Sequence, residues 1–292
     1  EVILEQAKEY NVCPFEMCLD TATWVDDIIC DYNYVFDPNV YLKRFFADGT
    51  TGDYIFLVDE AHNLVERSRE MYSAIIYKED FLLAKKILKK YGQAKLMREL
   101  EKCNRVLLSY KRECEKYVIY ESIGNFAFEL MNVASDLDEF LQKAPEFPER
   151  KDLSEFYLNL RNFLNIYELL DDHYVVYAEH EQDGRFKLKL YCVDPSKNLQ
   201  ERINKGNATI FFSATLLPVG YYKSLLSTET DNYAVYAKTA FRRSRVCYLW
   251  EATSAAGIQG ETKVSLNGLH SISKRPGLQK KEIIWCFFHP TK

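Results

Sequence analysis

The hydrophobic pattern predicts an α/β fold that a helical region interrupts. Short apolar runs at residues 27–30, 54–58 and 208–212 end abruptly at polar residues. Such runs are typical of short strands covered on both faces, as in a parallel sheet. The strongest is 54–58, where five apolar residues stop at Asp59, and the last stops at Ser213.

Residues 67–172 have a different period and predict a large helical insertion. Apolar residues recur there at steps of three and four, and a segment with two prolines, 144–148, predicts a break between helices. The expected helices are 78–93, 94–121, 125–143 and 152–170.

Strand character returns at residues 174–180 and 185–193. Apolar and polar residues alternate in the second run, and Asp183-Gly184 supplies the turn between the two. The alternation predicts a β-hairpin with one solvent-exposed face. We place this hairpin in a segment, 173–241, that returns to the α/β domain begun by residues 1–66.

Composition and charge change this picture little. The 292 residues are 47% hydrophobic with a formal net charge of −5, which indicates a globular chain without the basic signature of many nucleic-acid-binding proteins. The sequence contains no run of eighteen apolar residues, so it predicts no membrane span. The eight cysteines have no C-x-x-C spacing, which favours reduced thiols and a cytoplasmic protein.

Two polar motifs directly follow predicted strands. Asp59-Glu60-Ala61-His62 follows the first, and carboxylates at a strand's carboxyl end can hold Mg²⁺ and activate water. Ser213-Ala214-Thr215 follows the other, where hydroxyls can link a nucleotide site to a nucleic-acid groove. Taken singly, each motif could be a chance surface turn.

Together, residues 58–64 and 212–218, which contain these two motifs, resemble motifs II and III of superfamily 2 helicases. Asn11-Val12-Cys13-Pro14-Phe15-Glu16 and residues 30–38 further resemble the iron–sulfur XPD/DinG family of DEAH-box helicases, and the helical insertion falls where that family has its arch domain. The resemblance spans residues 1–241. It implies a partial RecA-like motor domain with a parallel sheet and a large helical arch insertion.

The resemblance also implies a function: an ATP-dependent 5′→3′ DNA helicase or translocase acting on single-stranded or forked DNA in DNA repair, associated with the nucleoid. Asp59 would bind Mg²⁺ of Mg-ATP, Glu60 would activate water, and His62 would link hydrolysis to Ser213 and Thr215.

The resemblance assigns further residues to cofactor and DNA. Cys13 would be one of four ligands of a [4Fe–4S] cluster. Tyr32, Asn33 and Tyr34 either stack on a single strand or pack the sheet. We expect Cys18 and Cys30 to be buried thiols outside the cluster, and two further cysteines, Cys103 and Cys114, to lie in the core.

The chain also departs from the family pattern. It contains no G-x-x-x-x-G-K-[ST] loop for the phosphates and begins without Met, so we expect an internal fragment of a bacterial-type member that lacks its N- and C-terminal parts. Residues 242–292 contain no Asp, three Glu and nine Lys or Arg, with poor apolar periodicity. Suitable codons can be chosen for residues 253–263 and 281–292. Read one base out of frame, these codons encode strings that resemble the start of the family's second motor domain.

We therefore interpret 242–292 as a frameshifted tail that forms no native sheet; a genuine basic tail is the alternative. Two other functions also stay open. A related ATPase could remodel protein–nucleic-acid complexes without unwinding. A non-enzymatic helical scaffold, with residues 67–172 as its functional part, would have no ordered strand before Asp59 and no closeness of Asp59 to Ser213.

Overall fold

The computed structural model describes residues 2–47, 49, 52–229, 233–235, 248–253 and 282–287. The chain divides into two compact units. The first comprises Glu1–Glu66 with Ser196–Lys292, and the second comprises Arg67–Pro195. The first boundary agrees with the predicted start of the insertion at residue 67.

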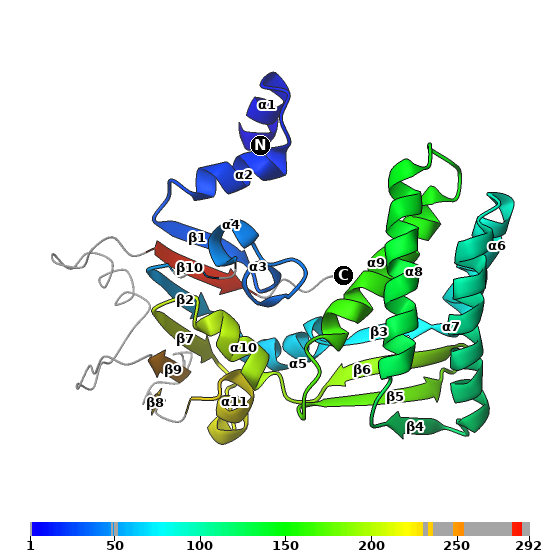
Figure 1. Cartoon of the computed structure of the whole chain (residues 1–292). Coiled ribbons are helices and arrows are strands. Elements are labelled where there is room, and N and C mark those ends of the chain that lie inside the picture. Colours follow the sequence, from blue (N-terminus) through cyan, green and yellow to red (C-terminus); the bar gives the residue numbers. More distant parts are fainter. Residues whose placement is uncertain are drawn as a thin grey trace. The chain divides into compact units, whose positions relative to one another are not determined.

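The first unit is built on a six-stranded sheet with the order β1-β10-β2-β7-β9-β8 (Figure 1). The neighbours from β1 to β7 run parallel, whereas β9 is antiparallel to both β7 and β8. The strands are β1 (Asp27–Asp31), β2 (Tyr54–Val58), β7 (Ala208–Ser213), β8 (Tyr233–Val235), β9 (Tyr248–Thr253) and β10 (Glu282–Phe287). The helices are α1 (Val2–Glu9), α2 (Pro14–Ala22), α3 (Asn33–Phe36), α4 (Lys43–Phe46), α5 (Ala61–Met71, which runs past the unit boundary), α10 (Ser196–Ile203) and α11 (Val219–Leu226).

The two strands that precede the polar motifs are direct neighbours. β2 pairs with β7 in parallel, with Val58 opposite Phe211. Both of these residues are fully buried, as the apolar runs predicted. Because parallel strands end at the same sheet edge, Asp59 and Ser213 emerge side by side. The predicted α/β fold with a mainly parallel sheet is confirmed.

Two expectations for the first unit are wrong. The run at 27–30 does form β1, but it is not buried: Ile29 is 72% exposed, because β1 is an edge strand. Residues 242–292 were expected to form no native-like sheet, yet β9 and β10 both pair within the six-stranded sheet. An apolar run such as 282–287 can satisfy its backbone groups by strand pairing whatever its origin. The rest of 242–292 lies outside the described residues.

The second unit packs four helices on one face of a four-stranded antiparallel sheet, with the order β3-β6-β5-β4 (Figure 1). The helices are α6 (Lys78–Lys90), α7 (Ala94–Glu113), α8 (Gly124–Lys143) and α9 (Arg150–Tyr167), close to the predicted ranges. The strands are β3 (Ala74–Tyr77), β4 (Tyr117–Tyr120), β5 (Tyr174–His180) and β6 (Phe186–Cys192). Among the helices that the structure describes, none is long and apolar enough to cross a membrane.

The structure corrects the placement of the predicted hairpin. β5 and β6 form it, with β6 alternating between buried and half-buried residues as expected. It pairs with β3 and β4 in the second unit, so the return to the parallel-sheet unit occurs at Ser196 and not at residue 173. Alternation identifies which face of a strand is buried but not which strand lies beside it.

Candidate functional site

The acidic motif occupies the turn between β2 and α5. Asp59 directly follows the strand, and its carboxylate Oδ1 accepts the backbone N–H of Glu60 at 2.8 Å. Glu60 has φ of 48°, in the left-handed region that costs a non-glycine residue about 1–2 kcal/mol. The turn is anchored on its helical side by Ala61 and Leu64, both fully buried. This sharp reversal keeps the Glu60 side chain half-exposed at the sheet edge.

Three side chains from the two motifs form a hydrogen-bonded triangle. The His62 Nδ1 atom lies 2.7 Å from Ser213 Oγ and 3.2 Å from Glu60 Oε2, and Ser213 Oγ donates to Glu60 Oε2 at 3.2 Å. Ser213 Oγ also accepts the backbone N–H of Thr215 at 3.2 Å. If Nδ1 carries a proton, the Ser213 hydroxyl accepts two hydrogen bonds and donates one, which satisfies it fully.

The triangle joins a buried residue to two accessible ones. Ser213 is 2% exposed, whereas the side chains of His62 and Glu60 are 29% and 49% exposed. Thr215 lies on the exposed side, with its Oγ1 3.4 Å from Ser213 Oγ. The buried Ser213 hydroxyl therefore connects the exposed Glu60 carboxylate to the end of β7.

Asp59 lies in a partly desolvated position. Burial is the main cause that raises the pKa of its carboxyl group above the usual 3.8, and the charge of Glu60 adds to it. A carboxylate that has lost part of its hydration, next to a second carboxylate, favours a bound cation. Mg²⁺ takes one or two carboxylates together with phosphate oxygens, so this donor set fits the ion.

Tyr32 supports the site from beneath. It is 2% exposed, and its hydroxyl donates to the backbone carbonyl of Asp59. Of the two alternatives for Tyr32, the structure shows packing. Its hydrogen bond to the carbonyl of Asp59 has no signal in the amino-acid pattern. Asn33 and Tyr34 are half-buried on α3, and the Tyr34 ring lies 6.3 Å from that of Phe15 between centroids.

The cysteines differ in part from expectation. Cys13 is exposed at the N-cap of α2, and Cys103 and Cys114 are buried as predicted. The expectation of buried thiols is wrong for Cys18, which is exposed, and for Cys30, which is half-buried. The reason at Cys18 is that α2 has no buried residue on any face.

The described residues hold no complete set of ligands for an iron–sulfur cluster. Four thiolates are needed, and the described residues contain no group of three neighbouring potential metal ligands that includes a cysteine. The donor set present does not fit a complete cluster.

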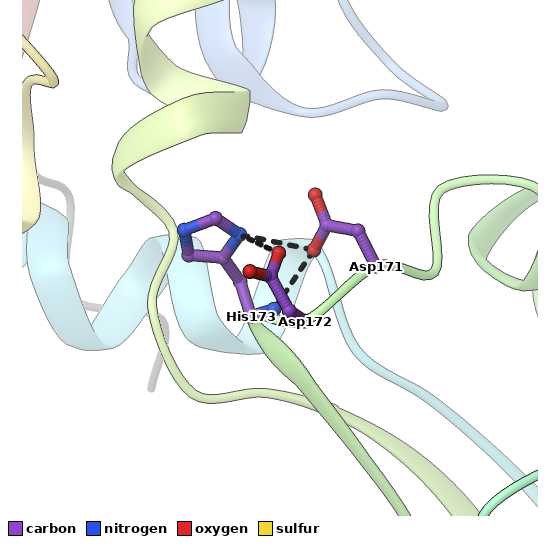
Figure 2. A group of neighbouring side chains, drawn as sticks. All are labelled: Asp171, Asp172 and His173. Carbon is purple, nitrogen blue, oxygen red and sulfur yellow. Dashed lines mark hydrogen bonds and ion pairs between the residues drawn. The ribbon is translucent and has the colours of Figure 1, made fainter.

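One other group of ionisable residues lies at the start of β5 in the second unit. Figure 2 shows Asp171 and Asp172 beside the same nitrogen of the His173 ring, Nδ1, which lies 3.1 Å and 3.2 Å from their Oδ1 atoms. The His173 backbone N–H also donates to Asp171 at 2.9 Å, and Asp172 is 91% exposed. These bonds account for the group as a turn that leads into the strand.

Comparison with known proteins bears on the first site. No curated protein matches the chain. Residues 1–81, which include β1, β2 and the acidic motif, match the DEAD_2 family. This match supports a superfamily 2 helicase family of the DEAD/DEAH type for the chain, and with it an ATP-dependent nucleic-acid motor domain.

Proposed function

We propose that the chain carries the hydrolytic half of the nucleotide site of a DNA helicase or translocase. The observation that carries the proposal is the triangle of Glu60, His62 and Ser213 at the carboxyl ends of two parallel, adjacent strands. Ligands of open α/β sheets bind at that edge. The scaffold alternative required Asp59 and Ser213 to lie apart, and the pairing of β2 with β7 argues against it.

Each residue has a distinct proposed role. Asp59 holds Mg²⁺, which would neutralise phosphate charge when nucleotide is bound. Glu60, half-exposed and already a hydrogen-bond acceptor, orients the attacking water and takes its proton. His62 and Thr215 connect this carboxylate to β7 through Ser213, so that hydrolysis and nucleic-acid binding affect one another.

We further propose that the chain is part of a longer XPD/DinG-type protein that moves 5′→3′ on single-stranded or forked DNA in repair. The phosphate-binding loop and the second motor domain would come from outside residues 1–292. Cys13, exposed at the start of α2, would be one cluster ligand, with the others supplied from elsewhere. Asn33 and Tyr34 would contact the strand. The frameshift origin of residues 242–292 stays a proposal, which the coding DNA tests.

Two measurements separate this proposal from a chance arrangement. In the whole protein, His62→Ala is expected to keep nucleotide binding and basal hydrolysis but to lose stimulation of hydrolysis by single-stranded DNA, because the link to Ser213 is gone. The control is His180→Ala, an exposed histidine at the end of β5. Full stimulation in His62→Ala would refute the coupling role. Residues 1–292 alone should not hydrolyse ATP, and DNA-stimulated hydrolysis by them would refute the fragment proposal.

A further inference from the structure

One face of the four-stranded sheet in the second unit is not used by the helical core. The inward residues of β3, β5 and β6, such as Ile76, Ala178 and Leu188, belong to the core that the helices complete. The residues between them point to the other side and are half-buried or exposed, and none belongs to that core. We call this side the open face; its central residues are Ile75, Ile119, Val175, Tyr177, Lys189 and Tyr191.

The strand register arranges these residues in rows. Ile119, Tyr177, Lys189 and Ile75 lie opposite one another across all four strands. Tyr191 pairs with a neighbour on β5 one row further on, so the two tyrosines are diagonal neighbours, about 7–8 Å apart. That separation gives two distinct rings on which separate planar groups can stack.

Charge on the open face is distributed unevenly. Lys187 is held by Glu179 and Glu181, each at 2.8 Å, and its side chain is only 14% exposed. Lys189 forms no ion pair with any residue that the structure describes. Its Nζ lies 4.7 Å from the centroid of the Tyr191 ring. The face thus offers one cation without an ion pair beside two aromatic rings.

We propose that the open face binds a single nucleic-acid strand, with bases on Tyr177 and Tyr191 and a phosphate on Lys189. Aromatic rings accept any base by stacking, and a neighbouring lysine supplies the backbone contact. An antiparallel four-stranded sheet with helices on one side and aromatic residues on the other is an arrangement known to bind RNA in this way. The exposed Tyr117 and Ile119 extend the surface to the edge strand β4.

This inference goes beyond the proposed function, because the surface lies in the second unit and needs neither nucleotide nor Glu60. The number of lysines without an ion pair on the open face determines how strongly binding depends on salt. With Lys187 neutralised by carboxylates, a single lysine contacts phosphate, so stacking contributes most of the affinity. Loss of Lys189 is therefore expected to reduce the salt dependence of binding by about 0.7 in the slope of log K against log salt.

The test is binding of fluorescein-labelled dT12 to the full chain, followed by fluorescence anisotropy at low salt. Tyr177→Leu and Tyr191→Leu are each expected to weaken binding by about 5-fold or more, the smallest effect of losing one stacked base. Tyr177→Phe keeps the ring and should stay within about 2-fold of wild type. Lys189→Gln should lower the salt slope, whereas Lys86→Gln, at an exposed position on α6, should change neither quantity. Circular dichroism checks that each variant is folded.

Crosslinking locates the strand independently of any substitution. Oligonucleotides with 5-iodouracil should crosslink to peptides that contain Tyr177 or Tyr191. Three results would overturn the proposal: crosslinks confined to residues 33–34, absence of binding, or unchanged affinity in both leucine variants. Crosslinks confined to residues 33–34 would leave the proposed motor function intact. A dimer of the chain that Ile119→Lys dissociates would assign the face to a second copy and also overturn it. Binding by the chain together with normal turnover of Glu60→Gln in the whole protein would count against the motor function alone.

Discussion

Ser213→Ala is the substitution that most directly probes the link between the two motifs. It removes one hydroxyl that bonds to Glu60, His62 and the backbone of Thr215. A net hydrogen bond contributes about 0.5–1.5 kcal/mol, but Glu60 and His62 are accessible enough for water to replace most of what they lose. The backbone N–H of Thr215 loses its acceptor as well. We therefore expect a loss of about 1–2 kcal/mol in the first unit.

Hydrogen exchange measured by mass spectrometry detects this loss locally. Protection of peptides covering Tyr54–Val58 and Ala208–Ser213 should fall by a factor of about 5–30, while α7, α8 and α9 keep theirs. The matched control is Ser224→Ala, because the Ser224 hydroxyl is exposed and donates only to the Tyr221 carbonyl at 2.9 Å. Equal protection in Ser213→Ala and wild type would refute the claim that the hydroxyl joins the strands' ends.

Three further predictions follow from burial. Because burial raises the pKa of Asp59, its protonated form stabilises the fold below about pH 3.8, and that stability is lost as pH rises through the folded-state pKa. Asp59→Asn should therefore raise Tm near pH 7 and change Tm little near pH 3. An equal shift in Tm at both pH values would contradict this. Iodoacetamide should label Cys13 and Cys18 in the native chain but not Cys103, whose thiol pKa burial raises to about 12, as peptide mapping can check. Leu188→Ala, at a fully buried position on β6, should cost about 2–5 kcal/mol in urea unfolding of the second unit, and a loss below 1 kcal/mol would show that the site is not packed.

The features that sequence predicted well are those with long or two-sided hydrophobic signals. The runs at Tyr54–Val58 and 208–212 are mostly apolar, which is typical of strands covered on both faces, and the polar residues that follow them form the site. The four long helices repeat their apolar period over several turns, so local pattern alone identified them.

The features that sequence missed depend on partners far along the chain. β3 and β4 have four residues each, too few to show a period, and β4 was assigned to the end of a helix. The hairpin of β5 and β6 was placed in the wrong unit because alternation does not identify neighbours. The bond from Tyr32 to Asp59 and the exposure of Cys18 likewise follow from how elements pack.

The central claim is that Glu60 activates water for ATP hydrolysis, and Glu60→Gln in the whole protein tests it most directly. The amide oxygen can still accept the hydrogen bond from Ser213, so the turn should persist while the base is lost. We predict that hydrolysis stimulated by single-stranded DNA falls by about 100-fold or more with nucleotide binding unchanged, whereas Glu66→Gln, at an exposed position on α5, stays active. Normal turnover in Glu60→Gln would contradict the account.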